Sequence, residues 1–488
     1  MENQEKDNKL KDWIQREELA ETMLHLVGKL YRDKGVIIMI YGRPVINCSP
    51  IDLIKAHRYV RLIEKDEIWV RESLPLLKVV AEQPLPSVRI DIGIMTTAYR
   101  AVKDQQTPVT FVKEQLKDVI GKKDVKPNGP QDVVLYGFGR IGRLMARLLI
   151  ENTGGGSKLR LRAIVVRKKE NDNIERRASL LRLDSVHGQF NGSITVDEES
   201  QSMLVNGNYI NLIYADSPHS IDYEQYGIKN AIIIDNTGVW RDEEGLGRHL
   251  ESKGVGKVLL TAPGKGNIKN IVHGINSGEI LPEDRILSAA SCTTNAIVPV
   301  LKAVNDKFGI ENGHLETIHA YTNDQNLLDN FHKGDRRGRS GPLNMVLTNT
   351  GAAKAVVKAI PELKGKLTAH AIRVPTPNVS MAILSLNFKT ATTKDELNEY
   401  LRQKALHSEM QEQIDYTSSL EIVSTDVVGS RFACVVDSQV TIVEEKRCVL
   451  YVWYDNEFGY SCQVLRVVEQ MAGIKIDTYP KLSVLSTP

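Results

Sequence analysis

A cysteine and a histidine are the side chains of this chain best suited to nucleophilic chemistry. Cys292 lies in the run SCTTN, directly before an apolar stretch over residues 296–304 that is typical of a helix. Ser291 is a suitable N-cap, so Cys292 falls in the first helical turn, where the helix dipole favours a thiolate. A reactive thiol also needs a base. His319 lies in a strand-like run, and a strand returning after the helix would bring its imidazole to the sulfur.

A glycine-rich turn marks a place where a dinucleotide could bind. The pattern GxGxxG, at Gly137, Gly139 and Gly142, follows an apolar run typical of a strand and precedes a run typical of a helix. In such a turn the first glycine permits the tight bend, the second admits the pyrophosphate, and the third lets the helix pack closely on the strand. The N–H groups of the helix N-terminus then face the anion. With a second apolar run at 161–166, this order predicts a dinucleotide-binding unit.

The residues after that second run bear on the choice between NAD and NADP, and they leave both open. If the strand ends at Val166, Arg167 and Lys168 occupy the position of the adenosine ribose, where cations favour a 2′-phosphate and hence NADP. If the loop is shifted, Glu170 or Asp172 could accept hydrogen bonds from the ribose hydroxyls, which favours NAD.

Composition limits what kind of protein carries these motifs. The 488 residues are 42% hydrophobic and 25% charged, which is typical of globular domains, and the net charge of +2 excludes a dedicated nucleic-acid binder. No apolar run approaches the roughly 20 residues of a membrane helix, and the charged N-terminus lacks the apolar segment of a secretory signal. Five cysteines without a CxxC pair predict neither a disulfide framework nor a metal site, and they favour a reducing cytoplasm.

The first 126 residues differ from the rest, where strand and helix patterns alternate. Apolar residues recur at helical spacing over 19–30, and Gly35 follows as a stop signal. This N-terminal region is therefore expected to be mostly helical, and it holds no residue that we assign to a site. Its other expected elements are helices over 51–64 and 109–120, either a strand or part of a buried helix over 36–41, and a linker over 121–132.

Several motifs in a fixed order make residues 133–473 resemble the phosphorylating glyceraldehyde-3-phosphate dehydrogenases, while the first 130 residues have no counterpart in the ordinary family enzyme. The motifs are GFGRIGR (137–143), DSVHG (184–188), SCTTN (291–295), TGAAKA (350–355), RVPTPNVS (373–380) and WYDNEFGYS (453–461).

The resemblance implies an α/β architecture with an extra, mostly helical N-terminal region over 1–126. A Rossmann-type, doubly wound dinucleotide domain is expected over 131–290. An α+β catalytic domain with a largely antiparallel sheet follows over 291–455, and a helix over 457–473 is expected to return to the dinucleotide domain. A homotetramer is expected from the family.

The resemblance also implies a reaction. Cys292 resembles the family's nucleophile and His319 its base, and glyceraldehyde 3-phosphate would be oxidised to 1,3-bisphosphoglycerate with NAD or NADP, through a hemithioacetal and a thioester that inorganic phosphate cleaves. The residues matching the substrate-phosphate site are Thr322, Asp324 and Arg373, and those matching the inorganic-phosphate site are Ser291, Thr293, Arg337, Thr350 and Gly351. For the cofactor, the matching residues beyond the glycines are Arg140 and Ile141 at the pyrophosphate, Thr261 near the nicotinamide ribose, Asn456 at the carboxamide and Tyr460 beside it.

Two other functions remain open. The same machinery acting on erythrose 4-phosphate is the alternative enzyme, although Thr322, Asp324 and Thr350 favour the three-carbon substrate. A dinucleotide-binding scaffold is the alternative from another class. Binding alone does not need a nucleophile and base, so the pair Cys292 and His319 argues against it. The expected partners are a small-molecule substrate and inorganic phosphate, with no membrane.

Overall fold

The computed structural model describes residues 2–64, 66–123, 129–152 and 158–481. The chain divides into two compact units. The extension unit comprises the chain up to residue 126, together with residues 406–409 and the segment from 475 onward. The main unit comprises residues 127–405 and 410–474. The central part of the expected linker, residues 124–128, lies outside the described residues.

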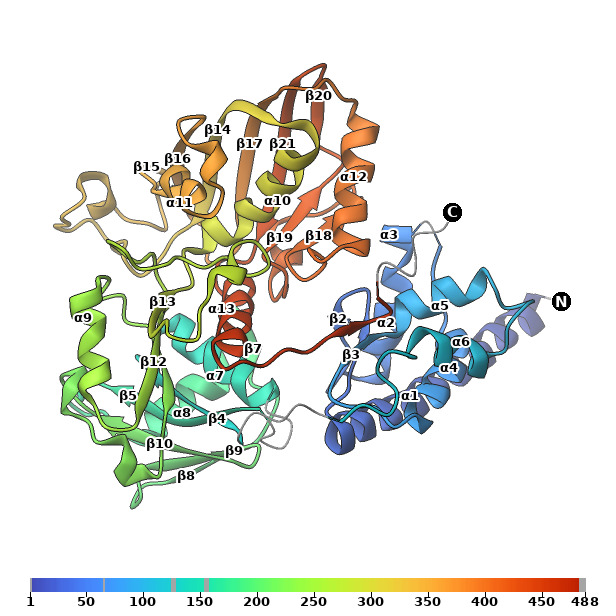
Figure 1. Ribbon diagram of the computed structural model, residues 1–488, viewed down its shortest axis with the longest axis horizontal. Helices are drawn as coiled ribbons and strands as arrows, with labels where there is room; N and C mark the ends of the chain where they lie inside the picture. The colour runs from blue at the N-terminus through green and yellow to red at the C-terminus, as the bar shows by residue number, and fades with distance from the viewer. Residues whose placement is uncertain (1, 65, 124–128, 153–157, 482–488) are drawn as a thin grey trace. The chain divides into compact units, whose positions relative to one another are not determined.

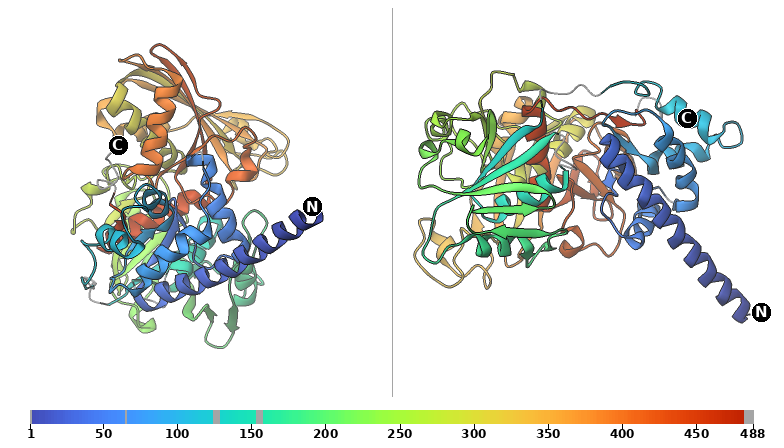
Figure 2. Two further views of the ribbon diagram at one scale, coloured as in Figure 1. Left: turned by 90° about the vertical axis from the view of Figure 1, so that its right-hand side faces the viewer. Right: turned by 90° about the horizontal axis from the view of Figure 1, so that it is seen from below.

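The extension unit is mostly helical, as expected. Its first helix, α1 (Glu2–Lys34), buries Ala20, Met23, Val27 and Leu30 on one face and ends at Gly35, whose φ of +65° suits glycine. Figure 2 shows the N-terminal part of α1 projecting beyond the other elements of this unit. The remaining helices are α2 (Pro50–Tyr59), α3 (Arg61–Glu64), α4 (Val70–Glu82), α5 (Ile92–Arg100) and α6 (Pro108–Gln115).

A small sheet completes the extension unit. The ambiguous run at 36–41 is a strand, β1 (Ile37–Ile40), which lies between β2 (Arg43–Pro44) and β3 (Arg89–Asp91). The fourth strand, β22 (Thr478–Tyr479), comes from the other end of the chain and pairs in parallel with β3. The backbone N–H of Arg89 donates to the carbonyl of Asp477 at 2.9 Å. The sheet of the extension unit is therefore completed at one edge by a strand that no local pattern in the sequence indicates.

The main unit begins with an eight-stranded sheet in the order β13-β12-β11-β4-β5-β10-β9-β8. Strands β13 to β10 of this path run parallel, and β10, β9 and β8 are antiparallel. The strands are β4 (Gln131–Tyr136), β5 (Leu159–Val166), β8 (Ile194–Asp197), β9 (Ser202–Val205), β10 (Asn208–Tyr214), β11 (Ala231–Asp235), β12 (Val255–Leu260) and β13 (Ile286–Ser288). Helices α7 (Arg140–Asn152), α8 (Ile174–Arg182) and α9 (Glu243–Gly247) connect them, and a hairpin of β6 (Leu183–Asp184) and β7 (Gly188–Gln189) follows α8.

A second eight-stranded sheet carries the chemistry. Its path is β15-β16-β14-β17-β21-β19-β18, with β20 paired to β21, and its pairs are antiparallel except β14 with β16 and β18 with β19. The strands are β14 (Ile310–Ala320), β15 (Val346–Thr348), β16 (Leu367–Val374), β17 (Ser380–Phe388), β18 (Ile414–Thr417), β19 (Cys434–Asp437), β20 (Ile442–Glu444) and β21 (Arg447–Tyr454). The helices are α10 (Cys292–Phe308), α11 (Ala352–Ala359) and α12 (Lys394–His407).

The last helix, α13 (Phe458–Met471), returns from this sheet to pack beside α7 (Figure 1). Its buried side chains, among them Val464 and Val468, join the same apolar core as Leu148 of α7. The N-termini of α7 and α13 carry the glycine turn and the WYDNEFGYS motif, so this packing brings two site motifs together. Among the described residues, no helix is both long and apolar enough to cross a membrane.

Candidate active site

The first turn of α10 presents the cysteine. Ser291 is the N-cap, and its hydroxyl accepts a hydrogen bond from the backbone N–H of Thr294 at 3.0 Å. The residue before it, Ala290, has a φ of +56°, a backbone conformation that costs energy for a residue with a side chain. Its carbonyl accepts a hydrogen bond from the Tyr460 hydroxyl at 3.0 Å, which holds the bend. Cys292 therefore begins the helix at a fixed position.

The histidine meets the cysteine from the neighbouring sheet. His319 lies near the end of β14, and its Nε2 is 3.5 Å from the Cys292 Sγ. Its Nδ1 is 2.7 Å from the carbonyl oxygen of Ala320, which can only accept a proton. The Arg373 guanidinium, which can only donate, contacts the same Nδ1. In the tautomer with its proton on Nδ1, the Nε2 is free to accept the thiol proton.

Arg373 lies against the same histidine. It sits on β16 directly across from His319 in the parallel ladder, contacts the His319 Nδ1 and donates to the carbonyl of Ala320 at 3.0 Å. Burial and, to a smaller extent, the Arg373 guanidinium lower the pKa of His319 to about 3. Burial also raises the pKa of the Cys292 thiol, although the Arg373 cation opposes that shift. Burial therefore favours a neutral thiol and a neutral imidazole, whereas the helix dipole and Arg373 favour the thiolate.

The second arginine of the expected phosphate sites is held by a carboxylate. Arg337 donates to Asp324 at 2.6 Å and to the Thr348 hydroxyl at 2.9 and 3.1 Å. Burial raises the pKa of Asp324, and the hydrogen bond from Arg337 lowers it. The net effect is a lowered pKa, so the carboxylate is charged. A charged carboxylate repels phosphate, so the geometry makes Asp324 a group that orients Arg337.

The hydroxyl groups expected at the phosphate sites have different surroundings. Thr293 is buried, and its hydroxyl lies 3.0 Å from that of Tyr454. Thr350 accepts a hydrogen bond from the Ala352 N–H at 3.2 Å, and Gly351 is the N-cap of α11. Thr322 is half-buried, with its backbone N–H 3.4 Å from the Gln325 side chain. The Thr293 hydroxyl therefore faces the protein interior. The contacts of Thr322 and Thr350 leave their hydroxyls able to face solvent.

The glycine turn has the shape that a dinucleotide requires. Gly137 has a φ of +97°, so the bend needs glycine there. A Cβ on Gly142 would lie 2.3 Å from the carbonyl oxygen of Gly137, so α7 packs against the turn only because no side chain intervenes. A Cβ on Gly139 would meet no atom within 4 Å, so its surface is open. The turn and the α7 N-terminus fit a pyrophosphate, with Ile141 in the first helical turn.

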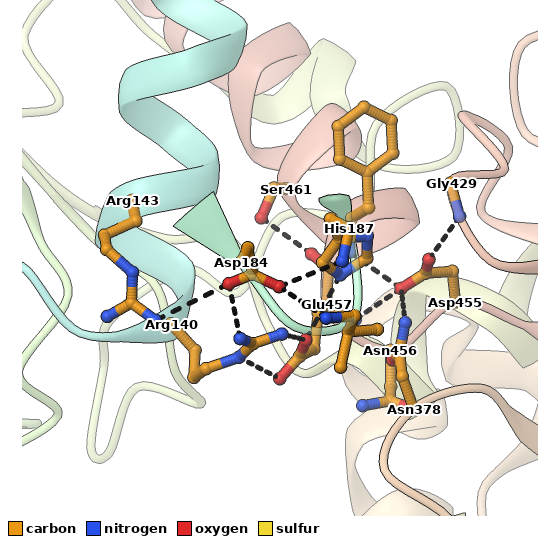
Figure 3. A network of polar contacts seen from close by, with 12 residues as sticks. Arg140, Arg143, Asp184, His187, Asn378, Gly429, Asp455, Asn456, Glu457 and Ser461 are labelled. Atoms are coloured by element: carbon orange, nitrogen blue, oxygen red, sulfur yellow. Dashed lines mark hydrogen bonds and ion pairs between the residues drawn. The ribbon is translucent and has the colours of Figure 1, made fainter. Parts of the chain in front are cut away.

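A cluster of charged side chains ties this turn to the N-terminus of α13 (Figure 3). Arg140 donates to Asp184 at 2.5 Å and to Glu457 at 3.0 Å, and His187 lies 3.2 Å from the same Glu457 carboxylate. Backbone N–H groups and the nearby cations outweigh burial and bring the pKa of Asp184 down to about 2. The Arg140 guanidinium is therefore held by carboxylates of the protein, and its backbone N–H lies at the start of α7, where a cofactor phosphate is expected.

The side chain of Asn456 is held in one orientation. Ser380 accepts a hydrogen bond from the Ala320 N–H at 3.1 Å and donates its own proton to the Asn456 Oδ1 at 2.8 Å. The Asn456 Nδ2 then has no hydrogen-bond partner among the described residues, so it is available to a carboxamide oxygen. The neighbouring Asp455 is buried and accepts from the Asn378 side chain and the Gly429 N–H at 2.9 and 2.8 Å (Figure 3).

The remaining cofactor residues lie at the carboxyl ends of the parallel strands. Thr261 follows β12, and its hydroxyl donates to the carbonyl of Asp235 at 3.1 Å. Strand β5 ends at Val166, so Arg167 and Lys168 come directly after it, both exposed. The Lys168 ammonium lies 5.3 Å from the centre of the Tyr214 ring.

Comparisons with known proteins agree with this geometry. A family model described as "Glyceraldehyde 3-phosphate dehydrogenase, NAD binding domain" matches residues 131–243, and one described as "Glyceraldehyde 3-phosphate dehydrogenase, C-terminal domain" matches residues 291–456. The chain belongs to the glyceraldehyde-3-phosphate dehydrogenase family. It is therefore a dehydrogenase with a binding domain for NAD or NADP, as the sequence motifs predict.

Relatives within the family differ in how much of the chain they share. A glyceraldehyde-3-phosphate dehydrogenase-like protein of Pseudomonas aeruginosa is 60% identical over 94% of this chain and 100% of its own length. The glyceraldehyde-3-phosphate dehydrogenase of Zymomonas mobilis is 37% identical over 70% of this chain and 98% of its own. Glyceraldehyde-3-phosphate dehydrogenase 2 of Bacillus subtilis is 38% identical over 70% and 96%. The Pseudomonas protein thus shares most of the extension, since the unmatched 6% is far shorter than 126 residues.

Several residues of the site carry no role in the sequence analysis. Glu457, Asp455, Ser380 and Tyr454 lie inside family motifs, yet only the fold shows their hydrogen bonds. The Tyr454 hydroxyl lies 3.0 Å from that of Thr293 and 2.7 Å from that of Thr317, and burial raises its pKa. One feature of the sequence could have indicated these residues. Their motifs contain many polar residues at positions where the surrounding pattern is typical of the end of a strand.

Proposed function

We propose that this family member is a phosphorylating dehydrogenase that converts glyceraldehyde 3-phosphate to 1,3-bisphosphoglycerate. The observation that carries the proposal is the 3.5 Å contact between the Cys292 sulfur and the His319 imidazole, with two arginines in the same domain. A nucleophile beside a base whose acceptor nitrogen is free is the arrangement that thiol addition to an aldehyde needs.

The first half of the reaction uses the cysteine and the histidine in turn. His319 Nε2 takes the thiol proton while the sulfur of Cys292 adds to the aldehyde carbon, and the returned proton gives a hemithioacetal hydroxyl. His319 then takes that hydroxyl proton as the C–H bond breaks and a thioester forms. NAD or NADP, when bound, supplies the hydride acceptor. The backbone N–H of Cys292, at the start of α10, is placed to stabilise the oxyanion.

The second half needs an oxyanion site. Inorganic phosphate attacks the thioester carbon, the C–S bond breaks, and the protonated His319 returns its proton to the departing Cys292 thiolate. The phosphate's own proton is released to solvent, so the product is an acyl phosphate. Arg373 and Arg337 are the cations available for the two phosphate groups, because a planar guanidinium binds an oxyanion through two hydrogen bonds. Ser291, Thr322, Thr350 and Gly351 complete the proposed sites.

For the cofactor, the observations favour NADP. Two exposed cations, Arg167 and Lys168, follow β5 at the position expected for the adenosine ribose. Of the two alternative acceptors, Glu170 is exposed, and Asp172 already receives a hydrogen bond from Arg177 at 2.9 Å, which lowers its pKa. We expect Arg167→Ala and Lys168→Ala to reduce kcat/KM for NADP about tenfold with little effect on NAD. Lys169→Ala is the matched control, and an unchanged ratio in the first two variants would contradict the assignment.

The proposal includes self-association. A segment of the catalytic domain exposes large apolar side chains, and Phe331 is 91% exposed. Its other exposed apolar residues are Leu327, Leu328, Leu343, Met345 and Leu347. So many exposed large apolar side chains in one segment are typical of an interface, so we expect a homo-oligomer, and the family favours a tetramer. Phe331→Glu should lower the mass measured by light scattering. A cytoplasmic location stays a prediction.

The full chain assayed with glyceraldehyde 3-phosphate, inorganic phosphate and each cofactor tests the function. We expect reduction of the cofactor that needs phosphate or arsenate, and none in Cys292→Ser. Faster turnover of erythrose 4-phosphate would favour the four-carbon alternative. Cofactor binding without reduction by either sugar, together with no labelling of Cys292 by iodoacetate, would favour the scaffold.

A further inference from the structure

The extension unit contains a cavity that the dehydrogenase reaction does not use. It lies between the middle of α1, the C-terminal half of α2 and the start of α4, and its space is about 630 Å³ including the open mouth. All its lining residues fall between 12 and 71, so it belongs to the extension unit alone. Apolar concave sites with a few convergent polar groups are where proteins bind small molecules, so the lining of this cavity indicates what it could hold.

The wall of the cavity is mainly apolar and aromatic. Its apolar lining residues are Trp13, Leu19, Ile54, Ile68, Trp69 and Val70. His57 also lines it, but its Nδ1 lies 2.8 Å from the carbonyl of Leu53 and its Nε2 lies 2.7 Å from the Ser73 hydroxyl. Because both ring nitrogens are already hydrogen-bonded and the imidazole is buried, His57 presents an uncharged ring. The lining therefore favours a flat, apolar ligand.

Arginines give the same cavity a positive character. Arg16 lies 4.1 Å from the centre of the Trp69 ring, and Arg71 lies 5.0 Å from it. Arg16 pairs with Asp12, and Arg58 with Glu67 at 3.7 Å, whereas Arg71 forms no ion pair with a described residue. The Nε of Arg16 is buried without a hydrogen-bond partner among the described residues. A buried N–H without a partner costs roughly 1–3 kcal/mol, so an acceptor that reaches it is stabilised.

We propose that this cavity binds a small aromatic anion. Its ring would occupy the apolar wall beside Trp13 and Trp69, and its carboxylate or phosphate would accept from the guanidinium of Arg16 and approach Arg71. The two tryptophans supply stacking area, and the two arginines supply the selectivity for charge. The site is separate in sequence from the catalytic residues, so its occupancy and the dehydrogenase reaction can be measured independently.

Calorimetric titration of the full chain with paired probes tests the proposal. Indole-3-acetate and indole-3-acetamide share a shape and differ in charge, and phenyl phosphate offers a phosphate instead of a carboxylate. We expect one indole-3-acetate per chain, bound at least about tenfold more tightly than the amide. Tighter binding of phenyl phosphate would identify the anion as a phosphate. Equal affinities for the acid and the amide, or no saturable binding of any of the three probes, would overturn the proposal.

Variants place the binding in the cavity. Ile54→Trp fills it and should abolish binding, and Arg16→Met, which keeps the linear stem, should weaken the acid about tenfold without changing the amide. Arg61→Met changes an exposed arginine outside the cavity and should leave both affinities unchanged. Cofactor affinity and circular dichroism of each variant report whether the chain is folded. Undiminished binding in a folded Ile54→Trp chain would refute the site.

Discussion

Adding one methyl group at Gly142 or at Gly139 should separate the packing role of the glycine turn from its binding role. A Cβ at Gly142 would lie 2.3 Å from the Gly137 carbonyl oxygen, and real Cβ atoms essentially never come within 3.0 Å of another atom, so α7 must move by about 0.7 Å. Overpacking of this kind costs about 3 kcal/mol. At about 2–4 °C per kcal/mol for a domain of this size, Gly142→Ala should lower the melting temperature by roughly 6–12 °C.

Gly139→Ala is the matched variant, because its Cβ would meet no atom within 4 Å in the cofactor-free chain. Its stability should change by only a few tenths of a kcal/mol, while the methyl group blocks the surface that the pyrophosphate approaches. Scanning calorimetry measures the first effect, and titration with NAD and NADP the second. The reasoning is refuted if Gly139→Ala keeps the normal cofactor affinity, or if Gly142→Ala melts with the wild type.

Further predictions concern acid stability, cofactor orientation and the extension. Burial lowers the pKa of His57 from 6.5 to about 4, so on acidification this group takes up a proton in the unfolded chain before it does so in the folded chain. As the pH falls from 6.5 to 4, His57 should therefore lower the free energy of unfolding by about 1.4 kcal/mol per pH unit. Denaturant titration should show a shallower fall in His57→Gln. Ser380→Ala should weaken the binding of NAD about tenfold, because the Asn456 amide is then no longer fixed. It should hardly affect the binding of thionicotinamide adenine dinucleotide, because the sulfur of that analogue is a poor hydrogen-bond acceptor. Ser385→Ala on the same strand should leave both affinities unchanged, and equal weakening of both cofactors by Ser380→Ala would contradict the orienting role. Tyr479→Ala should destabilise the extension unit by about 3 kcal/mol, measured by hydrogen exchange of β3, because this buried residue of β22 holds the sheet edge. Unchanged exchange would show that the sheet does not depend on β22.

Local patterns in the sequence predicted the parts of the fold that depend on neighbouring residues. The glycine turn between a strand and a helix, the N-cap at Ser291 and the stop at Gly35 each follow from backbone conformation. The alternating strands and helices likewise indicated the parallel sheet. The run at 36–41 was ambiguous because a short apolar segment fits a strand or a buried helix, and pairing with β3 decides it.

Contacts between distant segments could not be predicted in this way. The pairing of β22 with β3 joins the two ends of the chain, and its two residues carry no periodic signal. Within the site, the family motifs indicated which residues matter but not which residues they contact. Arg140 pairs with Glu457, and Asp324 with Arg337, only because the fold brings their elements together. The NADP assignment likewise depends on the end of β5, which a sequence pattern places within a few residues at best.

The alkylation rate of Cys292 by iodoacetamide across pH tests the account most directly. The 3.5 Å contact between the sulfur and the His319 Nε2 predicts that, at neutral pH, the wild type reacts about a hundredfold faster than His319→Asn, with the label located on Cys292 by mass spectrometry. Equal rates in the two proteins would show that the imidazole does not activate the thiol, and would contradict the proposed chemistry.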